Sequence, residues 1–437
     1  MSIIISLLIF SVIVIFHEFG HMLLAKKNGI KVVEFSVGLG PSIVSKEFHG
    51  TKYSIKILPF GGACQMLGED TVSDEDGERN LEGSYYSKSV WQRMSVILAG
   101  PFFNFILAFI LSLFIIGIAG YDPATVTSVS INSPAETAGL EAGDKILKIN
   151  NSKISIGRQV DAFFTYNGIS EEPVSITYER DGEKYETVIY PAKTKKYLLG
   201  FTYNSGEQSA VINELQSDYP MILAGAAVGD TIISVNGTEI SSGSELKNYF
   251  DLNPLTDADI KIVLSRGGET VEIVATPKLI SDTWSLGFNY NLYRYKGNAL
   301  EVVKYSFVEV KYWIQITIKN LGMLFTGQLT KDDVGGVVAI VDMIGDSYTE
   351  TKKSGTALDV VLQMMYISVL LSANLGVMNL LPIPALDGGK FLFLLVELII
   401  RKPLNRNLEG IVNLIGFVLL MLLMVFVFFN DIRRLFI

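Results

Sequence analysis

Two histidines four residues apart, with a glutamate beside the first, are the residues of this chain best suited to catalysis. His17, Glu18 and His21 directly follow residues 3–16, a run without a charged side chain. On a helix this spacing puts both imidazoles on one face, where they can hold one Zn²⁺, and Glu18 can take a proton from water on the metal. The alternative is a polar cluster that is capped or reaches the membrane surface. Because burying such groups in an apolar helix is costly, a functional site is the better interpretation.

A zinc ion held by two histidines needs a further protein ligand and an open position for water. His49, the remaining histidine, lies in a polar loop, and the single cysteine, Cys64, excludes a cysteine cluster and an intramolecular disulfide. Asp387 follows two prolines at the end of another apolar segment, where a helix can open and direct a carboxylate at the site. By itself its Asp-Gly pair would be an ordinary turn. Together with the motif, it predicts His17, His21 and Asp387 as metal ligands.

The composition predicts a few membrane helices together with a soluble part. The chain has 437 residues, of which 49% are hydrophobic and 19% charged, and its mean hydropathy is +0.36. Four apolar segments approach or exceed the ~20 residues that cross a bilayer as a helix. The first lacks a basic leader and a small-residue cleavage site, so we expect it to be retained. The segments span about residues 2–25, 94–119, 360–381 and 411–429.

Basic residues beside these segments predict the orientation of the chain. They gather in the loops after the first and third spans, and none precedes the first span, so both loops belong in the cytoplasm. Arg433 and Arg434 argue mildly against this. The N-terminus and the block 121–359 then lie outside the cell membrane, while the histidine motif and Asp387 both lie near its cytoplasmic side. The loop residues are Lys26, Lys27, Lys31, Lys46, Lys52, Lys56, Lys88 and Arg93, then Lys390, Arg401, Lys402 and Arg406.

The block between the second and third spans repeats itself. Residues 143–150, Gly-Asp-Lys-Ile-Leu-Lys-Ile-Asn, recur 86 residues later as Gly-Asp-Thr-Ile-Ile-Ser-Val-Asn. A period of this length predicts tandem domains of about 80 residues rather than a solenoid. Residues 133–140 resemble the helix-turn segment of bacterial PDZ domains, and residues 219–225 are a looser match. Residues 121–300 contain 23 Asp and Glu against 15 Lys and Arg, a net charge of −8. We therefore expect no nucleic-acid partner, and no nucleotide partner.

Taken together, these motifs resemble the site-2 protease family, in particular its RseP-type intramembrane zinc metalloproteases with two PDZ domains. The resemblance covers most of the chain and includes His-Glu-x-x-His in the first span and Asn-x-x-Pro-x-x-x-x-Asp-Gly at residues 379–388. One departure is Val334-Gly335-Gly336-Val337, where similar proteins usually have Gly-Pro-Val-Gly. Further matching motifs are Gly38-Leu39-Gly40-Pro41, Leu58-Pro59-Phe60-Gly61-Gly62, Ala99-Gly100-Pro101-Phe102-Phe103-Asn104 and the stretch around Gly335-Gly336-Val337.

The resemblance implies a zinc-dependent endopeptidase that cleaves transmembrane segments of single-pass membrane proteins within the bilayer. Substrates of similar bacterial proteins include anti-sigma factors and remnant signal peptides. Two other functions compete with this one: a membrane-anchored PDZ scaffold with a vestigial protease site, and a divalent-metal transporter. The complete set of two histidines, a glutamate and an aspartate argues against the scaffold. A transporter would need polar residues on several spans, yet the second and fourth are nearly free of ionisable groups, and Asp359 and Glu397 are better interpreted as interfacial charges.

Substrate binding is expected beside the histidine motif. A transmembrane substrate is helical and must unwind before attack, and an exposed strand can hold the unwound segment. Residues 32–37 and 53–58, separated by a glycine-rich turn and a polar hairpin, predict a sheet that dips toward the site; the alternative is a hairpin that only caps the first helix. The PDZ-like domains would either bind a substrate tail or exclude substrates with bulky external domains. The resemblance adds substrate-binding candidates, namely Asn379, Pro382, Gly38 and Gly40.

The sequence therefore predicts a multi-pass α-helical membrane protein with four transmembrane helices, a membrane-associated β-hairpin region and two extracytoplasmic α+β PDZ-like domains. Residues 305–325 carry charges at helical spacing and are expected to form an amphipathic helix at the membrane surface. The expected limits are 1–120 for an N-terminal protease half, 121–198 and 199–280 for the PDZ-like domains, 281–359 for a linker with the amphipathic helix, and 360–437 for a C-terminal protease half that carries the aspartate.

Overall fold

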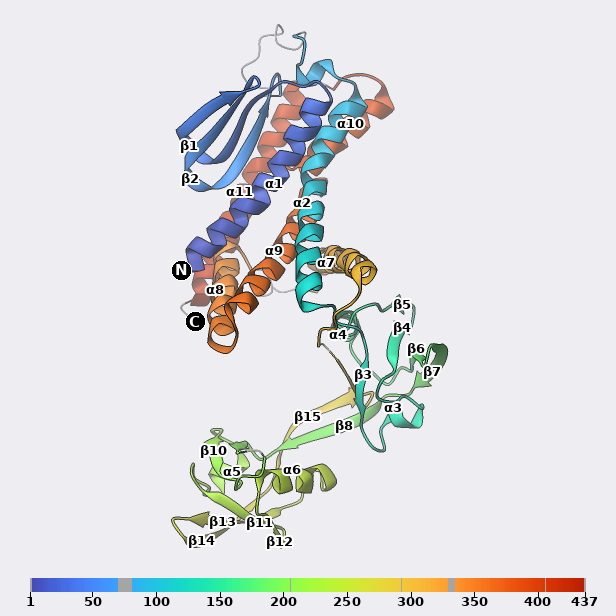
Figure 1. Cartoon of the computed structure of the whole chain (residues 1–437), viewed down its shortest axis with the longest axis vertical. Coiled ribbons are helices and arrows are strands. Elements are labelled where there is room, and N and C mark those ends of the chain that lie inside the picture. Colours follow the sequence, from blue (N-terminus) through green and yellow to red (C-terminus); the bar gives the residue numbers. More distant parts are fainter. Residues whose placement is uncertain are drawn as a thin grey trace. The chain divides into compact units, whose positions relative to one another are not determined.

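The chain folds into two compact units in the computed structural model, which describes residues 2–69, 81–204, 206–291, 293–328, 335–404 and 406–435 (Figure 1). The first unit comprises Met1–Asp122 and Tyr293–Ile437, and the second comprises Pro123–Leu292. The second unit is therefore an insertion between two halves of the first. Val334, part of the unusual glycine motif, lies outside the described residues.

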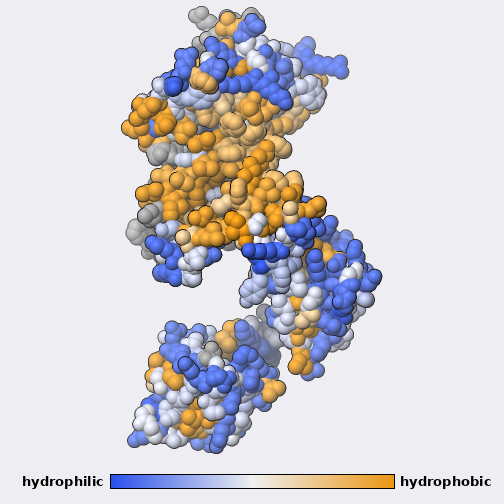
Figure 2. Space-filling view, viewed as in Figure 1, coloured by the Kyte–Doolittle hydropathy of each residue, from blue (hydrophilic) through white to orange (hydrophobic). Residues whose placement is uncertain are grey.

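Four long apolar helices form the frame of the first unit. α1 (Ser2–Lys27), α2 (Val90–Ala119), α9 (Ala357–Asn379) and α11 (Arg406–Leu435) contain the candidate membrane spans of the described chain, and they coincide with the four predicted spans. Figure 2 shows their exposed side chains as a hydrophobic band over the middle of this unit, between more hydrophilic surfaces. A band of this size is stable in lipid rather than in water, so the protein is a membrane protein.

Within its described residues the first unit contains three further α-helices, and two of them differ from the sequence prediction. α7 (Ala299–Phe325) matches the predicted amphipathic helix. α8 (Val337–Ser354) lies within the expected linker, and the carboxylate of Asp431 in α11 accepts hydrogen bonds from the backbone N–H groups at its start. α10 (Asp387–Ile400) occupies the expected basic loop after the third span. The third span thus ends before Asp387, and the aspartate begins a separate helix.

The β region of the first unit is larger than the predicted hairpin. β1 (Val32–Phe48) and β2 (Thr51–Met66) both bend and pair with each other in two places, so that residues 34–37 of β1 have partners in β2 both at 62–65 and at 52–55. The bend in β1 occurs at Gly38, whose φ of 89° and close approach to the carbonyl of Leu58 exclude a side chain. Residues 62–66 consequently form one outer edge of the sheet, and residues 42–48 form the opposite edge.

The second unit contains two small domains with the same order of elements. Their sheets have the strand orders β5-β4-β6-β7 and β12-β11-β13-β14. In both, an aspartate binds an arginine 36 residues later, and the Arg266 side chain holds the pKa of Asp230 below its ordinary value. The first domain contains β3 (Val126–Val129), α3 (Pro134–Thr137), β4 (Lys145–Ile149), β5 (Ser152–Lys153), α4 (Arg158–Asn167), β6 (Val174–Arg180) and β7 (Glu183–Ile189). The second contains β10 (Ile212–Leu215), α5 (Pro220–Leu223), β11 (Thr231–Val235), β12 (Thr238–Glu239), α6 (Gly243–Leu252), β13 (Ile260–Arg266) and β14 (Glu269–Ala275).

The second small domain is inserted into the first. β8 (Ala192–Leu198) leads out of the first domain and pairs with β15 (Lys278–Ser285), which leads back, while β9 (Phe201–Tyr203) pairs with β10. β16 (Phe288–Tyr290) then pairs with β3, and Leu286 is buried in the core of the first domain. The sequence prediction placed residues 286–290 in the linker that starts at 281, whereas the structure places them in the first domain. The repeat motif marks only the middle of each copy, so it could not reveal that residues 286–290 pair and pack with the first domain.

Truncation of Met221 tests this nested arrangement. Met221 is fully buried in the core of the second small domain, so Met221→Ala should destabilise that domain by about 2–5 kcal/mol. In the full-length protein, hydrogen exchange measured by mass spectrometry should then accelerate at residues 199–275, while residues 124–189 and 286–290 stay protected. The matched variant Ile149→Ala, in the other core, should expose 286–290 together with 124–189. Loss of protection at 286–290 in Met221→Ala would contradict the nested arrangement.

Candidate metal centre

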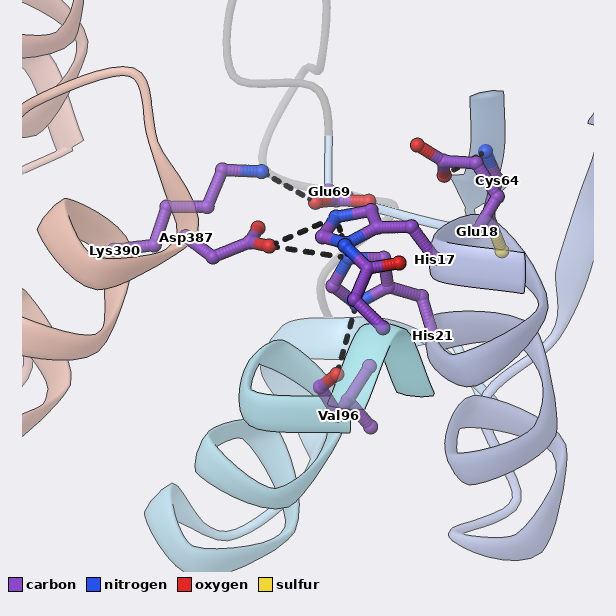
Figure 3. A network of polar contacts seen from close by, with 9 residues as sticks. His17, Glu18, His21, Cys64, Glu69, Val96, Asp387 and Lys390 are labelled. Carbon is purple, nitrogen blue, oxygen red and sulfur yellow. Dashed lines mark hydrogen bonds and ion pairs between the residues drawn. The ribbon is translucent and has the colours of Figure 1, made fainter. Parts of the chain in front are cut away.

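Three side chains from the two ends of the chain converge in the first unit (Figure 3). Nε2 of His17 lies 3.1 Å and Nε2 of His21 lies 3.4 Å from Oδ2 of Asp387, and the two Nε2 atoms are 3.2 Å apart. In the described part of the chain, these three residues form the group of His, Cys, Asp and Glu side chains that could hold a metal ion, with ligand atoms within 4.8 Å of one another. The structure thus brings together the three residues that the sequence nominated as ligands.

Close contact between α1 and α2 sets the position of the histidines. A Cβ on Gly20 would lie 2.5 Å from the carbonyl oxygen of Ala99, so α1 touches the backbone of α2 directly. A Cβ on Gly100 would overlap Nε2 of His21 and lie 2.7 Å from Cε1 of His17. Small residues allow such close approach of helices in a membrane. Gly100 is therefore required because the two imidazole rings occupy the space of its side chain.

One face of α2 holds the outer nitrogens of both rings. Nδ1 of His21 lies 2.9 Å from the carbonyl oxygen of Val96, and Nδ1 of His17 lies 3.3 Å from the side-chain amide of Asn104. Val96, Gly100 and Asn104 follow one another at four-residue spacing, so they share a face of the helix. With both Nδ1 atoms directed at α2, both Nε2 atoms are directed at the carboxylate of Asp387.

The loop between α9 and α10 places Asp387. Gly388 and Gly389 follow it, and a Cβ on either would overlap carbonyl oxygens of the preceding loop, so the loop folds back tightly over the start of α10. Ala385 adopts a φ of 75°, which is unusual for a residue with a side chain, and its N–H donates to Oδ1 of Asn413 in α11 at 3.3 Å. Support from α11 therefore stabilises the strained loop that carries the aspartate.

This donor set fits a divalent cation. Oδ2 of Asp387 is buried and makes no hydrogen bond with the described residues, although both imidazoles are close. Nε2 of both histidines is directed at this carboxylate, and the contact of His21 Nδ1 with the carbonyl oxygen of Val96 leaves a lone pair on Nε2 of His21. Three electron-pair donors at these distances repel one another unless a cation lies between them. Two imidazoles and one carboxylate are the ligands of several catalytic zinc sites, which keep a further position for water.

Glu18 lies beside this group in a cavity of about 390 Å³. Its Oε2 accepts a hydrogen bond of 2.9 Å from the backbone N–H of Cys64 in β2, which fixes the carboxylate next to the histidines without placing it among the ligand atoms. Asn379 lines the same cavity, whereas Pro382, Gly38 and Gly40 are not among its lining residues. Of the substrate-binding candidates, Asn379 alone is positioned to touch a molecule in this cavity.

Cys64 also lines the cavity, but its sulfur lies outside the group of candidate ligand atoms, which His17, His21 and Asp387 form within 4.8 Å of one another. Burial raises the pKa of the thiol to about 12, so without a bound cation it is protonated at neutral pH and is no nucleophile. Cys64 instead packs in an apolar cluster with Met22 and contributes its backbone N–H to Glu18.

Two ion pairs beside the site were missed by sequence reasoning. Nζ of Lys390 lies 2.7 Å from Oε1 of Glu69, and attraction to this carboxylate raises the pKa of Lys390 (Figure 3). Both residues line the cavity. The buried Arg93 of α2 donates to both carboxylate oxygens of Glu397 in α10. Lys390 follows Asp387 by three residues and so shares its helix face, but nothing in the sequence marks Glu69 or Arg93 as partners.

Comparisons with known proteins give similarities over the whole chain. The model of the family described as Peptidase family M50 matches residues 5–423. The regulator of sigma-W protease RasP of Bacillus subtilis is 31% identical, in an alignment that covers 100% of this chain and 99% of that protein. The zinc metalloprotease RasP of Geobacillus kaustophilus is 30% identical and covered to 98%, and that of Bacillus licheniformis is 30% identical and covered to 99%, each over 100% of this chain.

A methyl group at Gly100 tests the geometry of the centre. Gly100→Ala should displace both imidazoles and weaken zinc binding by at least about tenfold, measured by competition with a chelator on the purified protein. The matched control is Gly117→Ala on the same helix, where the nearest atom, Cγ1 of Val302, is 3.9 Å from the added carbon. Equal zinc affinity in the two variants would show that the histidines do not bind metal in the observed arrangement.

Proposed function

This chain belongs to peptidase family M50, the site-2 protease family, and on that premise we propose that it is a zinc-dependent endopeptidase that cleaves transmembrane segments of single-pass membrane proteins. The observation that supports this most is the convergence of His17, His21 and Asp387 within a unit built from apolar, membrane-length helices. The position of these ligands among such helices favours substrates whose scissile bond lies within the bilayer. The substrates are anti-sigma factors or remnant signal peptides by analogy with similar bacterial proteases.

The residues of the centre divide the chemistry between them. His17, His21 and Asp387 would hold zinc, which when bound supplies the Lewis acidity that activates water and polarises the scissile carbonyl. Glu18 acts as the general base: it takes a proton from the attacking water and passes it to the leaving amine. Its hydrogen bond from the N–H of Cys64 keeps the carboxylate in place for both transfers.

Residues 62–66 of β2 hold the unwound substrate as an added strand. The N–H of Cys64 is directed at Glu18, so the side of this strand that faces away from β1 faces the site. Alternate residues of a strand share this direction, which leaves the backbone N–H groups of Gly62 and Met66 facing the substrate. Strand addition supplies the hydrogen bonds that a helical substrate loses on unwinding. Gly38 and Gly40 contribute by bending β1, and Asn379, which lines the same cavity, contacts the substrate with its side chain.

The two small domains are PDZ-like and lie outside the cell, with the metal centre toward the cytoplasm; the basic residues of the loops support this orientation.

Deletion of residues 123–292 distinguishes the two candidate roles of these domains, which are binding of a substrate tail and exclusion of substrates with bulky external domains. The cut ends are suited to a short linker, because Tyr121 and Tyr295 are joined by backbone hydrogen bonds of 2.9 Å and 2.6 Å. Gained cleavage of a substrate with a bulky external domain indicates a size filter, and lost cleavage of every substrate indicates binding of a substrate tail.

Glu18→Gln separates metal binding from catalysis. The variant should keep the zinc content of the wild type. Because it lacks the general base, it should cleave a model transmembrane peptide about 10²–10⁴-fold more slowly. Zinc is measured by elemental analysis of the purified protein, and cleavage by gel or mass spectrometry. His17→Ala serves as the comparison that should lose both zinc and activity. A Glu18→Gln protein that cleaves at the wild-type rate would rule out this role.

Proline in the edge strand tests strand addition. Gly62→Pro removes an N–H that faces the site, so cleavage of a transmembrane substrate should slow by about 3–10-fold at unchanged zinc content. Gly62→Ala is the matched control, because a Cβ at this position already lies 3.0 Å from the carbonyl oxygen of Ser36 and 3.4 Å from Cγ of Glu18, so only the proline variant also loses the N–H. Ile43→Pro, on the exposed opposite edge of the same sheet, controls for proline in a strand. If Gly62→Pro and Gly62→Ala cleave at the same rate, the edge at residues 62–66 does not hold the substrate.

A further inference from the structure

Asn104 in α2 is the one buried amide in contact with the metal centre among the described residues. Its side chain is completely shielded from solvent, and its Nδ2 lies 3.3 Å from Nδ1 of His17. Its Oδ1 is buried without a hydrogen-bond partner. The backbone oxygen of the same residue accepts a hydrogen bond of 2.8 Å from Oγ of Ser372 in α9, which fixes this turn of α2 beside the site.

The protonation pattern that zinc binding requires of His17 conflicts with this orientation of the amide. Nε2 of His17 lies 3.1 Å from the carboxylate of Asp387 and 3.2 Å from Nε2 of His21, so as a zinc ligand it presents its lone pair to the metal there. A neutral imidazole that presents a lone pair at Nε2 carries its hydrogen at Nδ1. Nδ1 of His17 and Nδ2 of Asn104 would then both be donors, and two donors cannot bond to each other.

His21 provides the comparison within the same site. Its Nδ1 lies 2.9 Å from the carbonyl oxygen of Val96, a group that can only accept a hydrogen bond. That contact therefore requires a hydrogen on Nδ1 and leaves Nε2 free for the metal. Nδ1 of His17 contacts the same face of α2 eight residues further along that helix. There its partner is the side chain of Asn104 and not a backbone carbonyl.

A rotation of the amide by 180° removes the conflict. The oxygen and nitrogen of an asparagine side chain are assigned from their hydrogen bonds, and the two orientations have the same shape. In the rotated orientation Oδ1 faces Nδ1 of His17 and gains the partner that it lacks. From this geometry we infer that Asn104 is a positioning residue whose side-chain oxygen accepts the Nδ1 hydrogen of His17 and so directs Nε2 at zinc. The inference rests on the zinc site of the proposed function.

Two substitutions of similar size distinguish an acceptor from a donor or a packing group. Asn104→Asp keeps an acceptor at this position and loses the donor, whereas Asn104→Leu loses both. Partners of this kind typically contribute 10–100-fold to metal affinity, so Asn104→Leu should bind zinc about 10–100-fold more weakly and Asn104→Asp within about threefold of the wild type or more tightly. Ser112→Ala is the control, because Ser112 is another buried polar residue on α2 whose hydroxyl has no partner.

The experiment titrates the purified full-length proteins with zinc against a competing chelator. Wild type and Ser112→Ala should bind equally, and only the leucine variant should be weakened. Wild-type affinity in Asn104→Leu, or equal weakening in Asn104→Asp, would overturn the role of the side-chain oxygen. The proposed function fails separately, and the inference with it, if the wild type and a His17→Ala protein bind zinc equally. If the leucine variant does not fold, the aspartate variant still tests the inference: zinc affinity within about threefold of the wild type supports it, and clearly weakened affinity overturns it.

Discussion

The direct contact between α1 and α2 is the interaction on which the rest of the site depends. Gly20 and Gly100 allow the two helices to approach until the imidazoles of α1 press against the backbone of α2. At that distance the second helix can hold both rings through their outer nitrogens, at Val96 and at Asn104. Two isolated histidines on a lipid-facing helix would be mobile and costly to bury, and this contact turns them into a fixed pair.

The remaining elements serve to bring a carboxylate and a strand to that pair. The strained turn at Ala385, supported by α11, places Asp387 opposite the histidines, and the bent strand β1 carries β2 to Glu18. The ion pair between Lys390 and Glu69 connects the helix after the aspartate with the segment after β2. The polar groups of the centre are thus held from both sides by contacts among elements that are distant in sequence. This is how a water-dependent reaction can be housed among apolar helices.

The sequence revealed the parts of the site whose spacing is local, and it missed those that depend on packing. His17, Glu18 and His21 follow from one helical turn, and Asp387 from a broken span at matching depth. The partner of Lys390 could not be found, because Glu69 is 321 residues away and carries no pattern of its own. The edge strand and the return of β16 to the first small domain were equally hidden, since strand order depends on tertiary pairing rather than on local periodicity. Asn104 ends the motif at residues 99–104, but its contact with His17 forms only when α1 and α2 are packed together.

X-ray absorption at the zinc edge of the purified protein tests the central claim most directly. Two imidazoles and a carboxylate should give a first shell of nitrogen and oxygen at about 2.0–2.2 Å, with the outer-shell scattering of two histidine rings. The neighbouring Cys64 makes the result decisive, because its thiol lines the same cavity but is excluded from the proposed ligand set. A sulfur shell at about 2.3 Å, or a spectrum without imidazole scattering, would contradict the assignment of His17, His21 and Asp387 as the ligands.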